Sequence, residues 1–105
     1  MPDPDSQRPP YAVHASGAIT EAFLALQRRA TRAGQGEQVL SAMRDVHQRL
    51  AQAPFDFGEP LYRLPALRMQ VRCGLVAPLA VHFGVCEDRP VVFIKGITLI
   101  SDLTA

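Results

Sequence analysis

Basic side chains that could bind phosphate gather in one stretch of the sequence, residues 61–86. This stretch contains Arg63, Arg68, Arg72 and His82 but no acidic residue, so its local charge is positive although the whole chain has a formal net charge of only +1. A guanidinium group can hold a phosphate through two parallel hydrogen bonds, and an imidazole can exchange protons near neutral pH. These residue types therefore favour contact with a nucleic-acid backbone.

The strand that follows could add an aromatic ring and an ammonium group to the same surface. The last two predicted strands would pair around a turn at residues 86–90. The expected pairs are Val85 with Pro90, Phe83 with Val92, His82 with Phe93, and Ala80 with Lys95. This register places Phe93 and Lys95 away from the helices, and we expect Arg68 and Arg72 on that face too. A charged face with an exposed ring suits an RNA backbone with a stacked base.

A second interpretation of the basic stretch remains open. The outer face of a half-buried antiparallel sheet is normally polar, and arginines on it can simply protect an edge against aggregation. The total charge of +1 gives no general signature of a nucleic-acid or membrane binder. Arg28, Arg29 and Arg32 are likewise expected to form the solvated face of a helix.

Other kinds of chemistry find little support in the sequence. His14 and His47 share no ligand spacing, so we predict no metal site and no cofactor. Cys73 and Cys86 form no CxxC motif, and such sparse cysteines indicate a reducing compartment. The acidic, proline-rich start lacks the features of a signal peptide, and no apolar run is long enough to span a membrane. We therefore expect a cytoplasmic protein with no membrane partner.

The elements that must position the basic residues follow from hydrophobic periodicity. Residues 1–10 contain four prolines and are predicted to be a disordered arm, and residues 11–105 to be a single α+β domain. A short strand at 11–14 precedes helices at 18–33 and 37–52, which form an antiparallel hairpin around a glycine turn. An ordered connection at 54–65 then leads into a three-stranded antiparallel meander. We expect the core to contain Phe23, Leu26, Val46, Leu50, Val81, Phe83, Val92 and Ile94.

This order of elements resembles the RelE/ParE superfamily of type II toxins. The resemblance covers residues 11–99 and depends on the segments PFDFGEPLYRL, LRMQVRCG and LAVHFGVCEDRPVVFIKGI. It implies a toxin-like component of a toxin-antitoxin system that binds RNA or the translation machinery and is held by an antitoxin peptide. It further implies a metal-independent endoribonuclease. In this resemblance Arg68 corresponds to the first basic residue of the catalytic strand and Arg72 lies at its end. Together with the register above, the expected catalytic groups are Arg68, Arg72 and His82, and the expected substrate-binding groups are Arg63, Gln70, Phe93 and Lys95.

The sequence also departs from the family pattern. Gln70 stands where a second active-site lysine would be, and Pro78 lies near the place of an expected arginine. The segment 97–105 contains neither the arginine nor the tyrosine of the family's C-terminal tail. Two alternatives therefore stay open, a gyrase-directed toxin and a non-catalytic interaction module of the same fold.

Overall fold

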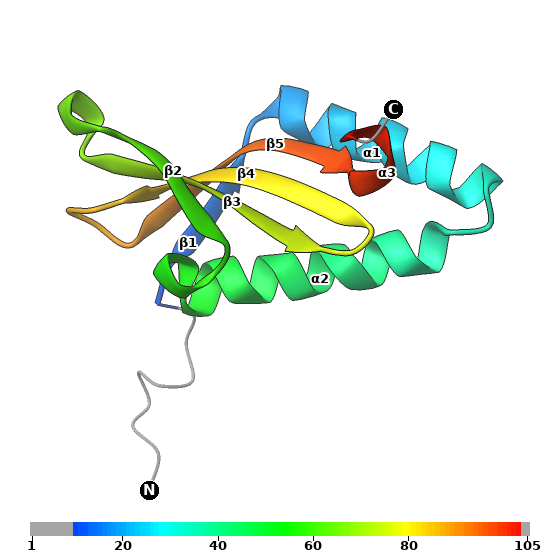
Figure 1. The fold of residues 1–105 in the computed structure, drawn as a ribbon, viewed down its shortest axis with the longest axis horizontal. Helices are drawn as coiled ribbons and strands as arrows, with labels where there is room; N and C mark the ends of the chain where they lie inside the picture. The colour runs from blue at the N-terminus through cyan, green and yellow to red at the C-terminus, as the bar shows by residue number, and fades with distance from the viewer. Residues whose placement is uncertain (1–9, 104–105) are drawn as a thin grey trace, which may run out of the picture.

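The chain runs from one short strand through two helices into four consecutive strands and a last helical turn (Figure 1). The computed structural model describes residues 10–103, so the predicted N-terminal arm lies outside the described residues except for Pro10. The helices are α1 (Gly17–Arg32), α2 (Gly36–Gln52) and α3 (Ile100–Leu103), and the short 3-10 turns are η2 (Pro54–Asp56) and η3 (Pro65–Leu67). The strands are β1 (Ala12–Ala15), β2 (Glu59–Leu64), β3 (Met69–Val76), β4 (Leu79–Cys86) and β5 (Val91–Leu99). The predicted α+β class is confirmed.

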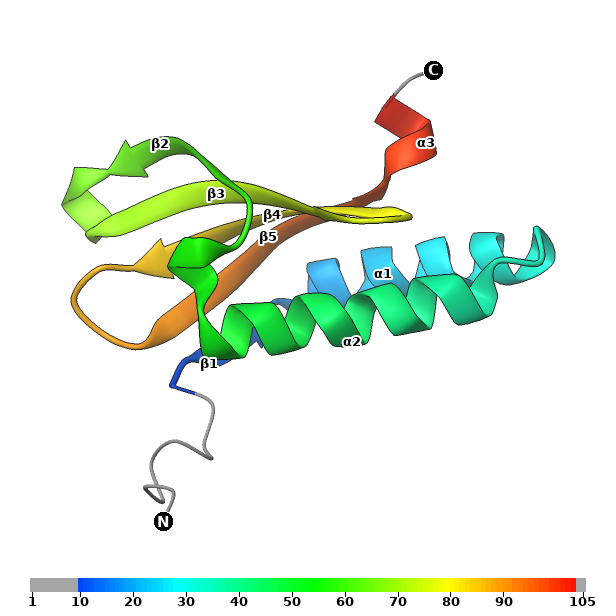
Figure 2. The same ribbon diagram turned by 60° about the horizontal axis from the view of Figure 1, so that its bottom comes forward.

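The strands form a single mixed sheet in the order β1-β5-β4-β3-β2, and α1 and α2 lie together against one of its faces (Figure 2). β1 is parallel to β5, whereas the other neighbouring strands are antiparallel. The sheet thus has one antiparallel strand more than predicted, because the connection at 54–65 contains β2. Pro60 lies at an irregularity of this edge strand, where a proline is tolerated, and its presence gave the segment the sequence pattern of a loop.

The predicted helices are confirmed, and each directs an apolar stripe at the sheet. The side chain of Ser16 caps α1 by accepting a hydrogen bond from the Ile19 amide, at 3.2 Å. The buried core residues come from both helices and from β4 and β5, and Phe57 stacks on Phe83 with ring centroids 5.5 Å apart. Seven of the eight predicted core residues are buried, and the eighth, Phe23, is partly buried against the same cluster.

The pairing of β4 with β5 differs from the predicted register. Phe83 pairs with Ile94 and Val85 with Val92, so the partner of Phe83 lies two residues further along than predicted. A shift by an even number of residues keeps every side chain on the same face of the sheet. The predicted core-facing side of β4 is therefore correct. A bulge follows, and His82 pairs with Gly96 instead of Phe93. Pro90 has no amide hydrogen to give to a ladder, and the longer turn leaves it outside β5.

Gly58, between η2 and β2, is expected to resist substitution. Its φ is +70°, and a Cβ at this position would meet the carbonyl group of Cys73. Gly58→Ala should therefore lower the free energy of unfolding by about 2 kcal/mol, measured by urea denaturation. Gly17 is the matched control, because a Cβ there would meet nothing within 4 Å. Equal midpoints for Gly58→Ala and Gly17→Ala would contradict the close approach of η2 to β3.

Candidate functional site

Arg72, predicted as an exposed catalytic group, is a buried structural residue. It pairs with Phe83 across β3 and β4 and therefore points to the helix-covered face, where only 7% of its surface is exposed. Its Nε donates to the Phe57 carbonyl at 3.1 Å and its Nη2 to the Gly58 carbonyl at 2.9 Å. Its Nη1 donates to Gln70 Oε1 at 2.6 Å. Arg72 thus fastens the η2–β2 connection to the sheet, and Gln70 is engaged with it.

The predicted face of β3 is therefore wrong. The prediction placed Met69 and Val71 on the helix side because they alternate with polar residues, but they lie on the other side and are buried there. In the register of the sheet they are opposite Leu64 and Tyr62 of β2, the strand that was not predicted. With both faces of β3 covered, alternation alone could not show which face the helices occupy.

The other two predicted arginines are engaged by the acidic turn between β4 and β5. Arg63 forms an ion pair with Glu87, with Nη2 and Oε1 2.8 Å apart, and this hydrogen-bonded carboxylate raises the pKa of Arg63 above its ordinary value. Arg68 leaves η3 with a φ of +48° and lies 4.0 Å from the Asp88 carboxylate. The local excess of positive charge expected from residues 61–86 is thus reduced by carboxylates that follow it in the sequence.

The remaining predicted residues lie on the sheet face away from the helices. His82 and Lys95 are exposed, and Phe93 stacks on His14 with ring centroids 5.7 Å apart. Next to this ring pair is a hollow of about 470 Å³ lined also by Arg89, whose pKa is raised chiefly by a hydrogen bond to Cys86. This face, which we call the open face, brings together His82, Phe93 and Lys95 but neither Arg68 nor Arg72.

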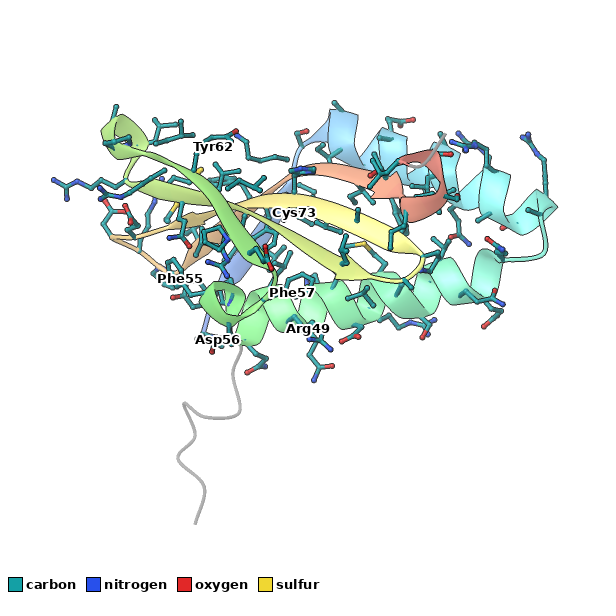
Figure 3. All side chains as sticks on the ribbon, viewed as in Figure 1. Arg49, Phe55, Asp56, Phe57, Tyr62 and Cys73 are labelled. Carbon is teal, nitrogen blue, oxygen red and sulfur yellow. The ribbon has the colours of Figure 1, made fainter. Side chains whose placement is uncertain are left out.

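A second site, which the sequence analysis missed, follows α2 along the edge of β3. It consists of three adjoining hollows of about 470, 370 and 600 Å³, which we call the α2 groove. Figure 3 labels four of its lining residues, Arg49, Asp56, Phe57 and Cys73. Asp45 lines the first two hollows, and Arg49, Asp56 and Phe57 line both the second and the third. Arg49 lies over the Phe57 ring, 5.6 Å from its centroid, and pairs with Asp45 at 3.0 Å. Arg49 thus connects α2 with Phe57, the residue after η2, inside the groove.

Carboxylates dominate the charge of the α2 groove. Its acidic lining residues are Glu37, Asp45, Asp56 and Glu59, and among the described residues Arg49 is the one cation that lines it. Of these carboxylates, only that of Asp45 takes part in an ion pair within residues 10–103. Two exposed leucines of the sheet, Leu61 and Leu75, complete the third hollow. No signal in the sequence alone indicates this site, because the exposure of the leucines and the lack of ion pairs at three of the carboxylates within residues 10–103 depend on the fold.

The described residues offer no other recognisable chemistry. Across residues 10–103 no three metal-ligating side chains come together, and none of the helices in that range has the length and apolar character needed to cross a membrane. Cys73, half-buried in the groove, and the buried Cys86 are free thiols. Compared with protein-family models, curated proteins and solved structures, the chain shows no match.

Proposed function

We propose that this chain is a non-catalytic interaction module of RelE/ParE-like organisation, which acts by holding a segment of a partner protein. The observation that carries the proposal is the burial of Arg72, whose guanidinium group already binds two backbone carbonyls and Gln70. Arg63 and Arg68 are in ion pairs with Glu87 and Asp88. The three arginines of the predicted site are thus engaged by internal contacts, whereas His82 and Lys95 stay exposed.

The chemistry of RNA cleavage argues in the same direction. Cleavage of an RNA phosphodiester by its own 2′-hydroxyl forms a cyclic phosphate and releases the 5′-oxygen. It needs a positioned base for the 2′-hydroxyl, a proton donor for the 5′-oxygen and cations that stabilise the charge of the transition state. Within residues 10–103, His82 has no hydrogen-bond partner that would orient its imidazole. Its partner across the strands is Gly96, which directly follows the exposed Lys95. A single exposed imidazole and one ammonium group are a weak basis for such a reaction. A protein that only binds a partner needs neither a catalytic base nor cations that stabilise a transition state.

A second candidate function, RNA binding by a toxin, is favoured by the open face. The stacked rings of His14 and Phe93, together with His82 and Lys95, offer a platform for one base and a neighbouring phosphate. This candidate differs from the first in its target and in the residues it uses, because His82, Phe93 and Lys95 do not line the α2 groove, which lies along α2 and reaches the face away from the helices at Cys73 and Leu75. The two can therefore be separated by substitution.

We expect the chain to leave bacterial growth and messenger RNA unaffected. The test compares the parent with a His82→Ala/Lys95→Ala variant, both induced in a bacterial host without an antitoxin and both incubated with ribosomes carrying a labelled message. Intact message with either protein supports the interaction module. Growth arrest without cleavage by both proteins supports a protein target, such as gyrase, bound through another face. Cleavage or arrest that only the parent causes would overturn the proposal in favour of the RNA-directed toxin.

A further inference from the structure

The edge of β3 beside the α2 groove has no neighbouring strand over its last residues. β2 pairs with β3 from Leu64↔Met69 to Glu59↔Cys73, whereas β4 pairs with β3 as far as Val76. The Phe57 ring and the backbone of Gly58 lie against Gly74, so Leu75 and Val76 are the residues of β3 that have β4 on one side and no segment of η2 or β2 on the other. Leu75, in this segment, is 61% exposed. An unpaired edge of this kind is where another extended chain can add to a sheet.

The length of the groove suits a short strand. α2 runs beside the β3–β4 hairpin (Figure 1), and its 17 residues span roughly 25 Å at 1.5 Å per residue. An extended segment rises about 3.3 Å per residue, so roughly eight residues would run from the first hollow to the third, and the part of the segment beside Leu75 and Val76 would pair with β3. Side chains of such a strand point alternately to the two sides of the sheet. One set would face α2 and η2, and the other would lie over the sheet near Leu75.

Charge identifies the chemistry of the segment. Glu37, Asp56 and Glu59 have no ion-pair partner among the described residues, so basic side chains of a ligand could pair with them without breaking an existing contact. Leu61 is 50% exposed and lies with Leu75 in the third hollow, where apolar side chains of a ligand would lose contact with water. The negative charge disfavours a nucleic acid in this groove.

We infer that the α2 groove binds an extended, basic segment of a partner protein, in which Lys or Arg alternates with Val, Ile or Leu, as an added strand on the open edge of β3. This inference rests on the proposed function and specifies its partner. Main-chain hydrogen bonds to the edge supply the common part of the affinity, and the carboxylates with the two leucines select the sequence.

The first test uses two fluorescein-labelled nonapeptides that alternate Val with Lys or Val with Glu. In fluorescence anisotropy the lysine peptide should bind at least about ten-fold more tightly than the glutamate peptide, and its affinity should fall with salt. Asp56→Asn/Glu59→Gln should weaken its binding by about five-fold, since each exposed charge pair contributes little by itself. The matched control is Glu21→Gln on α1, which removes an exposed, unpaired carboxylate outside the groove and should leave the affinity unchanged. Equal binding of both peptides, or none, would overturn the inference.

The second test asks whether the ligand binds as a strand. A lysine peptide with every second backbone amide methylated keeps its charge and side chains but cannot complete a ladder, so it should lose at least about ten-fold in affinity. Leu75→Ser should also weaken binding, whereas Leu24→Ser, at an exposed leucine of α1, should not. Undiminished binding of the methylated peptide would contradict binding as an added strand. Dimers of the chain that disappear with Leu75→Ser would also contradict the inference, because a second copy and not a partner peptide would then occupy the edge. RNA cleavage through the open face would contradict the proposed function and leave these peptide measurements unchanged.

Discussion

Arg72→Ala should lower the free energy of unfolding by about 3 kcal/mol, because it removes a buried, charge-assisted donor and leaves the carbonyls of Phe57 and Gly58 without a partner. Urea denaturation followed by circular dichroism measures the change. The variant should also expose the η2–β2 connection to protease before the rest of the chain unfolds.

Arg68→Ala is the matched control, since this exposed arginine at the end of η3 has one ion-pair contact, 4.0 Å long, with Asp88. Its removal should change the free energy of unfolding by less than about 0.5 kcal/mol. A stable Arg72→Ala variant that loses a growth-arrest phenotype would restore the catalytic role implied by the toxin resemblance. Loss of activity in an unfolded Arg72 variant would say nothing about catalysis.

Phe83→Ala should have the largest effect of all, a loss of about 3 to 5 kcal/mol in the free energy of unfolding. The ring of Phe83 is completely buried in the centre of the core and stacks on Phe57. Its loss leaves a cavity between the sheet and the η2 segment. Calorimetry or urea denaturation checks the value.

Phe55→Ala serves as the comparison, because this ring is partly exposed and has an edge-on contact with Tyr11, 6.4 Å away between ring centroids. We expect about 1 kcal/mol or less for its removal. Similar losses for the two phenylalanines would mean that the Phe83 site collapses without a cavity, and that the core is not closed around this ring.

Hydrophobic periodicity correctly predicted the helices and strands that have one solvent-exposed face and one buried face. The stripe of α2, with Val46 and Leu50 a turn apart, and the alternation of Val81 and Phe83 in β4 both lead to the observed core. β3 lies between β2 and β4 and is covered on both faces, so its alternation of Val71 with Arg72 had two solutions. The prediction chose the wrong solution, and it therefore placed Arg72 on the face away from the helices.

The candidate site was harder to predict because it depends on contacts between distant segments. The residue types of the basic stretch were evident, but the carboxylates that engage Arg63 and Arg68 lie in a turn two strands later. The carbonyls that bind Arg72 belong to Phe57 and Gly58, the two residues that follow the 3-10 turn η2. The α2 groove likewise combines α2, η2 and two strands. No local pattern contains such information.

The position of β5 between β1 and β4 constrains how the chain can fold while it is being made. Val13 of β1 pairs with Val92 of β5, across nearly the whole described sequence. On the ribosome, the helix hairpin has all its residues early, but β1 must wait for a partner that is translated after every other strand. Contacts of such long range carry a high entropic cost before they form. Completion of the sheet is therefore a late event, and until β5 leaves the exit tunnel the apolar face of α1, which packs on the sheet mainly at β5, depends on other protection from water.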